Sequence, residues 1–98
     1  MRTVRRVLDY TWDSEKEAIN VRKRGIWFDE AKTVLQGRLT VSWFDETHSM
    51  DEPRFKTIGY SALGRLLVVV TSDDGVQPRI ISAWRATKRE RDAYERRR

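Results

Sequence analysis

The chain is most constrained by an uninterrupted apolar run at positions 66–70, Leu-Leu-Val-Val-Val, within a sequence that is 36% charged. A short apolar run bounded by turn-forming residues is typical of a strand that is covered on both faces. Gly64 precedes the run, and Asp73-Asp74-Gly75 follows it. We therefore expect residues 66–70 to form the central strand of a sheet, with both faces buried.

Three further segments alternate between apolar and polar residues, which is the period of a strand with one buried face. They are residues 39–44, 54–61 and 79–84. In the last segment the alternation predicts two faces, one with Ile81 and Ala83 and the other with Ile80, Ser82 and Trp84. Because short connections join these four strands, they should form an antiparallel meander.

Residues 14–24 carry the signals of a helix. Ser14 and Glu17 have the spacing of a capping box, and Asp13 is the competing N-cap. Gly25 is expected to end this helix, because glycine readily takes the left-handed conformation that follows a helix C-terminus.

A second helix should follow directly. Phe28, Ala31, Val34 and Leu35 are spaced to share one helix face, and Gly37 should end the helix. Both early helices are then expected to cover the same face of the sheet.

A short strand and a third helix complete the expected fold. Residues 4–10 alternate as a strand, and Thr87 with Glu90 forms a capping box that opens a C-terminal helix. We therefore expect one α+β domain over residues 1–98. Its N-terminal strand and two helices should pack on a four-stranded antiparallel sheet, with a helix at the C-terminus.

The composition excludes several kinds of site. Cysteine is absent and His48 is the only histidine. This excludes a disulfide scaffold, a thiolate zinc site and a cysteine nucleophile, and it argues against a histidine-based metal site. We expect no metal and no cofactor. No apolar stretch approaches the roughly 18 residues of a membrane span, and residues 1–10 lack the apolar core of a secretory signal. The expectation is a cytoplasmic protein with no membrane partner.

The basic charge is concentrated at the C-terminus. Positions 76–98 hold eight basic and three acidic residues, so this segment carries the whole net charge of +5. Arginine outnumbers lysine by 15 to 5, and the guanidinium group binds phosphate in a bidentate manner. One interpretation is a chain that binds polyanions. The other is a high-GC genome combined with a solvated C-terminal helix, and the composition favours neither.

An ordered series of short motifs resembles the BrnT family of toxins. The series comprises Trp12-Asp13, Lys16, Asn20, Lys23-Arg24-Gly25-Ile26, Phe28-Asp29-Glu30-Ala31, His48, Glu52-Pro53-Arg54-Phe55, Ile58-Gly59, Gly64-Arg65-Leu66-Leu67-Val68-Val69-Val70, Arg79-Ile80-Ile81-Ser82-Ala83, Arg85-Ala86-Thr87-Lys88-Arg89-Glu90-Arg91 and Tyr94-Glu95. Each motif alone is weak, but together they cover nearly the whole chain in order.

This resemblance implies a specific function. BrnT proteins are toxins of type II toxin–antitoxin systems with a RelE-like ribonuclease fold, and they arrest translation by cleaving RNA. The implied substrate is RNA, including ribosome-bound mRNA. The implied partner is a BrnA-like ribbon-helix-helix antitoxin, which joins the toxin in a heterotetramer that represses their operon. Contact with DNA would then come only through the antitoxin.

The chain departs from the family pattern at two positions. The family usually shows Lys-His-Gly where this chain has Lys23-Arg24-Gly25, and Ser-Ala-Arg where it has Ser82-Ala83-Trp84. The first change removes a group that exchanges protons near neutral pH. The second removes a fixed positive charge, for which the adjacent Arg85 offers partial compensation. Both changes raise the prospect of a weakened nuclease.

RNA cleavage without a metal sets the chemistry that the candidate residues must supply. The ribose 2′-hydroxyl attacks the neighbouring phosphate, so the site needs a base, cations for the developing charge, and an acid for the leaving 5′-oxygen. The resemblance implies four candidate catalytic residues, namely Lys23, His48, Arg54 and Arg79. If the strands that carry Arg54 and Arg79 are neighbours, these arginines could flank one groove.

Substrate binding is expected of a second set, namely Arg24, Trp84, Arg85, Lys88 and Arg89. Each candidate also has a purely structural explanation. A surface arginine often pairs with a carboxylate, and a lysine such as Lys23 is favoured at a helix C-terminus by the helix dipole.

His48 is the one side chain with an ordinary pKa, about 6.5, that suits proton transfer at pH 7. Its acidic neighbours, Asp45, Glu46, Asp51 and Glu52, would raise that pKa and favour an imidazolium that acts as general acid. The alternative is a solvated loop histidine. Glu52 could likewise be a base or a solvated carboxylate.

Two other functions stay open at this point. The departures at Arg24 and Trp84 are compatible with a degenerate toxin that survives as the partner and co-repressor of a DNA-binding antitoxin. The clustered C-terminal charge is compatible with a non-catalytic nucleic-acid-binding module.

Overall fold

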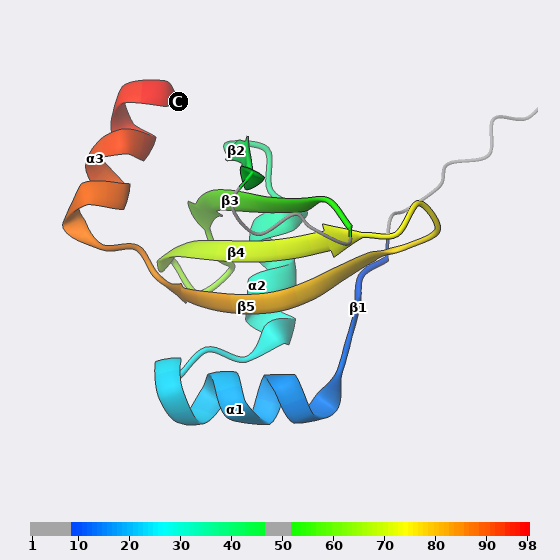
Figure 1. The fold of residues 1–98 in the computed structure, drawn as a ribbon. Helices are drawn as coiled ribbons and strands as arrows, with labels where there is room; N and C mark the ends of the chain where they lie inside the picture. The colour runs from blue at the N-terminus through cyan, green and yellow to red at the C-terminus, as the bar shows by residue number, and fades with distance from the viewer. Residues whose placement is uncertain (1–8, 47–51) are drawn as a thin grey trace, which may run out of the picture.

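The computed structural model describes residues 9–46 and 52–98, which form a five-stranded sheet with helices on both of its faces (Figure 1). In chain order the elements are β1 (Thr11–Trp12), α1 (Ser14–Arg24), α2 (Phe28–Leu35), β2 (Val41–Phe44), β3 (Arg54–Tyr60), β4 (Leu66–Asp73), β5 (Pro78–Arg85) and α3 (Lys88–Arg97). The strand order is β1-β5-β4-β3-β2. Strands β2 to β5 are antiparallel in succession, and β1 runs parallel to β5. The α+β class and the antiparallel meander are thus confirmed.

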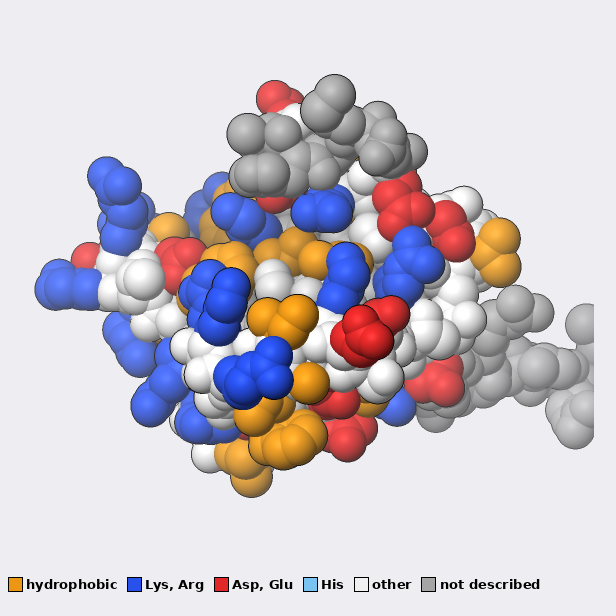
Figure 2. Space-filling model, turned by 60° about the horizontal axis from the view of Figure 1, so that its bottom comes forward, with side chains coloured by type: hydrophobic (Ala, Val, Ile, Leu, Met, Phe, Trp, Pro, Cys, Tyr) orange, Lys and Arg blue, Asp and Glu red, His pale blue; other side chains and the backbone are white. Residues whose placement is uncertain are grey.

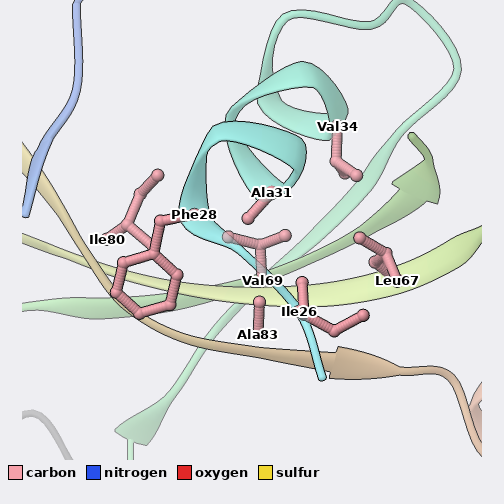
Figure 3. Packing of buried hydrophobic residues seen from close by; sticks show 8 residues of the cluster. All are labelled: Ile26, Phe28, Ala31, Val34, Leu67, Val69, Ile80 and Ala83. Carbon is pink, nitrogen blue, oxygen red and sulfur yellow. The ribbon is translucent and has the colours of Figure 1, made fainter. Parts of the chain in front are cut away.

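The prediction for residues 66–70 is confirmed, because they lie in β4 at the centre of the sheet and all are buried. Leu67 and Val69 face α2, where they pack with a cluster that no solvent reaches (Figure 3). The other members of this cluster are Ile26, Phe28, Ala31, Val34, Ile80 and Ala83. Leu66 and Val68 point to the opposite face, so both faces of the strand are buried.

Of the described residues, those that cover the opposite face of the sheet lie at one end of it. There Ile58, Leu66 and Val68 pack against Tyr94 of α3. The Tyr94 hydroxyl donates a hydrogen bond of 2.9 Å to the Leu39 carbonyl oxygen, which ties α3 to the chain just before β2. A helix with one buried side chain needs such an anchor to remain docked. The remainder of this face is left open for the polar side chains described below.

Helix boundaries follow the predicted capping residues with two corrections. One is that α2 ends at Leu35 with Gln36 as its C-cap, and not at the predicted Gly37. Asp13 caps α1 by accepting hydrogen bonds from the Glu15 and Lys16 amides, so the predicted Ser14–Glu17 capping box is wrong. The Glu17 carboxylate instead accepts from the Phe28 amide at 2.8 Å and ties α1 to the start of α2. The predicted end at Gly25 (φ 73°) and the capping box that opens α3 are both confirmed.

The expected four-stranded antiparallel sheet is corrected to a five-stranded mixed sheet. Thr11 and Trp12 pair with Arg79 and Ile80 at the outer edge of β5. The Trp12 ring meets the Phe28 ring edge-on at 6.1 Å, so packing against α2 holds this short segment beside the sheet. The strand predicted over residues 4–10 therefore gives way to one at 11–12, and residues 4–8 lie outside the described residues.

Within the described part of the chain, none of the helices combines the length and the apolarity needed to cross a lipid bilayer.

Candidate nucleic-acid interface

Two arginines flank the central strand on the open face of the sheet. Arg54 of β3 lies opposite Ser72 of β4, and Ser72 lies opposite Arg79 of β5. Strands β3 and β5 are not neighbours, because β4 lies between them, yet the register still aligns both arginines in one row. Because alternate residues of a strand share a face, the next row on this face contains Lys56 and Ser82.

A β-bulge in β5 widens this face. The register of β4 against β5 shifts between Val70 and Thr71, which pair with Ser82 and Ile80, so Ile81 is the extra residue. A bulge re-aims side chains at the point where it occurs. As a result Ile81 and Ser82 both reach the open face, and Ile80 and Ala83 both enter the core on the other side. The two predicted faces of this strand are corrected accordingly.

Helix α1 supplies further cations along the edge of β5. Lys16, Asn20 and Lys23 are spaced at i, i+4 and i+7, which places them on one side of a helix. Asn20 is buried and fastens this side to the sheet. Its side-chain nitrogen donates to the carbonyl oxygens of Ile26 (2.9 Å) and Ala83 (3.0 Å), and its oxygen accepts from the Ala83 amide at 3.1 Å. Lys16 and Lys23 are thereby held next to Ile81 and the arginines.

These side chains line three adjoining hollows that we call the basic trough. Ile81 lines all three hollows. The other residues that line the trough are Asp13, Lys16, Ile19, Asn20, Lys23, Arg24, Asp45, Glu52, Arg54, Lys56, Val70, Arg79, Ile80, Ser82 and Trp84. The hollows have volumes of about 250, 210 and 190 Å³. Each lies below the roughly 300 Å³ at which small-molecule pockets begin. The shape therefore suits an extended ligand that lies across the surface.

The trough is electropositive. Among the lining residues that the structure describes, six are basic and three are acidic. Figure 2 shows the same imbalance as Lys and Arg side chains gathered around a few hydrophobic ones on this side of the molecule. One acidic residue, Asp13, already serves as the cap of α1. A surface of this kind attracts the phosphate groups of a nucleic acid.

Glu52 lies inside the trough beside Arg79. The Arg79 guanidinium donates to the Glu52 carboxylate at 2.6 Å, and the Glu52 side chain is 28% exposed. The Ser72 hydroxyl is buried and has no hydrogen-bond partner among the residues that the structure describes, but it lies close enough to the Glu52 carboxylate to favour its charged form. Ser72 first, and then Arg79, lowers the pKa of Glu52 below its usual range. The carboxylate is therefore ionised at neutral pH.

One end of the trough is formed by Arg24 and Trp84. The Arg24 guanidinium carbon lies 4.9 Å from the centre of the Trp84 ring, which is the geometry of a cation–π contact. The indole N–H donates to the Glu90 carboxylate at 3.1 Å, and the same carboxylate accepts from the Thr87 amide that opens α3. The ring is therefore fixed in place by contacts from α1 and α3.

The sequence and the fold are both similar to those of known proteins. Residues 12–90 match the model of a family described as ribonuclease toxin, BrnT, of type II toxin–antitoxin system. The chain belongs to the BrnT family. The crystal structure of the ribonuclease toxin BrnT from Brucella abortus is similar in fold, with a TM-score of 0.61 and 20% sequence identity. The match covers 84% of this chain and 100% of the Brucella chain. No curated protein matches the sequence.

In this BrnT-family chain the predicted residues fall into two groups. Three of the four candidate catalytic residues, Lys23, Arg54 and Arg79, line the basic trough together with Arg24 and Trp84. His48 lies outside the described residues.

The other candidates lie away from the trough. Arg85 pairs with Leu67, which faces α2, and the positive charge of Arg85 lowers the pKa of Glu30 on that side of the sheet. Glu30 owes that lowered pKa chiefly to its hydrogen bond with Arg65. Lys88 and Arg89 are exposed on α3, where Lys88 pairs with Asp92 at 3.3 Å. These three positions stay predictions for substrate binding.

Sequence reasoning missed two cations of the BrnT-family trough. Lys16 could have been found from its spacing with Asn20 and Lys23 on one side of the first helix. Lys56 could have been found because it lies two residues after Arg54 in the same strand, and therefore on the same face. In the described ranges, 9–46 and 52–98, no three His, Cys, Asp or Glu residues are grouped closely enough to hold a metal ion.

Proposed function

We propose that this chain is the toxin of a type II toxin–antitoxin system and that it cleaves RNA in the basic trough by a metal-independent reaction. The observation that carries the proposal is that Lys23 lines one hollow of the basic trough and that Arg54 and Arg79 line the adjoining one. The two hollows share Lys16 and Ile81. Lys23, Arg54 and Arg79 come from three separate segments of the chain. Membership of a family described as ribonuclease toxins supports RNA as the substrate.

The proposed reaction uses the ribose 2′-hydroxyl as nucleophile. It attacks the adjacent phosphorus, the bond from phosphorus to the 5′-oxygen breaks, and the products are a 2′,3′-cyclic phosphate and a 5′-hydroxyl. Arg54 and Arg79, on either side of Ser72, would bind the phosphate oxygens and stabilise the charge that develops on them. Lys23 would add a cation, and His48 would protonate the leaving oxygen.

The remaining candidates would bind the substrate around the reacting phosphate. Arg24 and Trp84 offer flat groups on which an unpaired base can stack. Arg85, Lys88 and Arg89 would add phosphate contacts only for longer RNA. Cleavage of mRNA, free or on the ribosome, would arrest translation in the cytoplasm.

A ribbon-helix-helix antitoxin of the BrnA type is the proposed partner. It would neutralise the toxin in a heterotetramer and repress the shared operon, so that the toxin touches DNA only through its partner. The test is co-expression with the product of a neighbouring gene of that type. It should restore the growth that the chain alone arrests, and the two proteins should co-purify.

The test of the activity uses the purified chain with single-stranded RNA in a buffer containing a chelator. We expect cleavage that leaves 2′,3′-cyclic phosphate ends. Removing one preorganised charge typically costs about 10²–10³ in rate, so Arg54→Ala and Arg79→Ala should each lower kcat/KM by that factor.

The matched control is Arg38→Ala, because Arg38 is an exposed arginine between α2 and β2. Its activity should equal that of the unmodified chain. A chain that leaves both free and ribosome-bound RNA intact contradicts the nuclease, and cleavage that stops in chelator contradicts metal independence.

A further inference from the structure

On the basis of the proposed function, we infer that Glu52 is a catalytic residue and that its carboxylate accepts the proton of the ribose 2′-hydroxyl. Nothing in the family description assigns this role to Glu52. The assignment depends on where the carboxylate lies in the basic trough and on which other acceptors the trough contains.

The carboxylate lies where the reacting phosphate would be bound. Glu52 lines the same hollow as Lys16, Arg54 and Arg79. It contacts the Arg79 guanidinium at 2.6 Å. A phosphate held by Arg54 and Arg79 would therefore bring its adjacent ribose next to Glu52, and a general base needs to be within hydrogen-bond reach of the proton that it removes.

The surroundings keep Glu52 charged and ready to accept a proton. Ser72 and Arg79 face it from β4 and β5, Arg54 and Lys16 line the same hollow from β3 and α1, and Asp13 lines it at the N-terminus of α1. Asp74, in the turn after β4, opposes them weakly. Asp73 lines a neighbouring hollow that also includes Glu52. The effect of the cations and of the Ser72 hydroxyl exceeds that of Asp74, so the pKa of Glu52 is lowered.

The other described groups of the trough are poorer acceptors. Its lysines and arginines are cations that donate hydrogen bonds and offer no acceptor for a proton. Asp13 already accepts the Glu15 and Lys16 amides as a helix cap. Asp45 lines the hollow of Arg54, Lys56 and Trp84, and it does not line the hollow that contains Arg79. Glu52 therefore lines the same hollow as Arg79 and contacts its guanidinium, whereas Asp45 lines a neighbouring hollow.

The proton balance of the step is simple. As the 2′-oxygen forms its bond to phosphorus, its proton passes to the Glu52 carboxylate. The bond to the 5′-oxygen breaks with its electron pair, and that oxygen takes a proton from an acid of the site or from water. Glu52 then loses its proton to solvent, which returns the site to its starting state without an oxidant, a reductant or a metal.

The test measures single-turnover cleavage of a short single-stranded RNA by the full chain and its variants across pH. Glu52→Gln keeps the shape and removes the acceptor, so the cleavage rate should fall by about 10²–10⁴. RNA affinity should be unchanged or tighter, because a negative charge has been removed from the trough. Glu95→Gln, the same change at an exposed position on α3, should behave as the unmodified chain.

The pH profile of the unmodified chain gives an independent readout. With Glu52 as base, activity should persist from about pH 7 to about pH 5, because its pKa lies below the ordinary carboxylate range. Loss of activity between about pH 7 and pH 6 would identify an imidazole as the acceptor and overturn the assignment. Glu52→Asp should keep the shape of this profile at a lower rate, and circular dichroism verifies that each variant is folded.

Three outcomes separate this inference from the proposed function. If the unmodified chain cleaves RNA and the Glu52→Gln variant cleaves it within about threefold of the same rate, the role of Glu52 is overturned and the proposed function stands. Faster cleavage by that variant would show instead that Glu52 obstructs the trough. An unmodified chain that cleaves no RNA overturns both proposals.

Discussion

Replacing Asn20 with alanine should destabilise the chain more than any surface change. Among the described residues, β1 pairs with β5 only at Arg79 and Ile80, and no described strand pairs with the edge of β5 beyond that point. The Asn20 amide occupies the next part of that edge by bonding both the N–H and the C=O of Ala83. It also bonds the Ile26 carbonyl, and it is only 6% exposed. The side chain thus takes the place of a neighbouring strand.

The magnitude follows from these three hydrogen bonds. The Asn20→Ala variant loses all three bonds and leaves three buried backbone groups without partners. Each such group costs about 1–3 kcal/mol of stability in the worst case. Allowing for partial access of water to the opened edge, we expect the free energy of unfolding to fall by about 3 kcal/mol. That is a large fraction of the roughly 5–15 kcal/mol typical of a domain, and it corresponds to a Tm lower by about 12–24 °C.

Urea denaturation followed by tryptophan fluorescence measures this loss. Gln36→Ala, which removes an exposed amide side chain, should change stability by less than about 0.5 kcal/mol. Asn20→Asp should be no better than alanine, because it sets a carboxylate against two carbonyl oxygens. If Asn20→Ala costs less than about 1 kcal/mol, the side chain does not complete the β5 edge as argued.

Three further predictions concern stability. Arg65 binds the buried Glu30 carboxylate and lowers the pKa of Glu30, so the pair stabilises the fold above the ordinary carboxylate pKa, and this stability is lost as the pH falls through the lowered pKa of Glu30. Arg65→Ala should therefore lower the free energy of unfolding by about 3 kcal/mol at pH 7. Glu30→Gln should flatten the acid limb of a plot of Tm against pH. A Cβ on Gly59 would lie 2.9 Å from Thr40 Cγ2, so Gly59→Ala should lower stability in urea by about 1–3 kcal/mol, and an unchanged midpoint would contradict this close packing. Tyr94→Phe loses one hydrogen bond to a backbone carbonyl and should cost about 1 kcal/mol, whereas an equal loss for Tyr94→Ala would show that the ring does not anchor α3.

The sequence predicts the central strand without ambiguity, whereas it leaves the N-cap of α1 open between two residues. Residues 66–70 identify the central strand because only burial on both faces accommodates five consecutive apolar side chains. The N-cap of α1 was ambiguous, because Asp13 and Ser14 both carry a side-chain oxygen at a suitable place. Which of the two faces the free amides depends on the angle at which the chain enters the helix. That angle is set by the pairing of β1 with β5, which is a tertiary contact.

The trough was predicted only in part because of the bulge at Ile81. Simple alternation puts Arg79 and Arg85 on the same face of β5, and the extra residue between them reverses that relation. Arg79 therefore faces the trough, and Arg85 faces α2. Nothing in the local pattern marks the bulge, since Ile80 and Ile81 are equally apolar. Lys16 was missed for a different reason, because its role depends on the docking of α1 against β5.

The contact between Arg24 and Trp84 indicates that the two departures from the usual BrnT pattern are coupled and should be considered together. The usual pattern has an imidazole ring at the first position and a guanidinium at the second. This chain has the guanidinium at position 24 and a ring at position 84, and the two groups touch. The ring and the guanidinium have thus changed places between positions 24 and 84, so this end of the trough still has one cation in contact with one ring. Arg24→His and Trp84→Arg should then be strongly non-additive in a double-mutant cycle, and neither departure by itself argues for a lost activity.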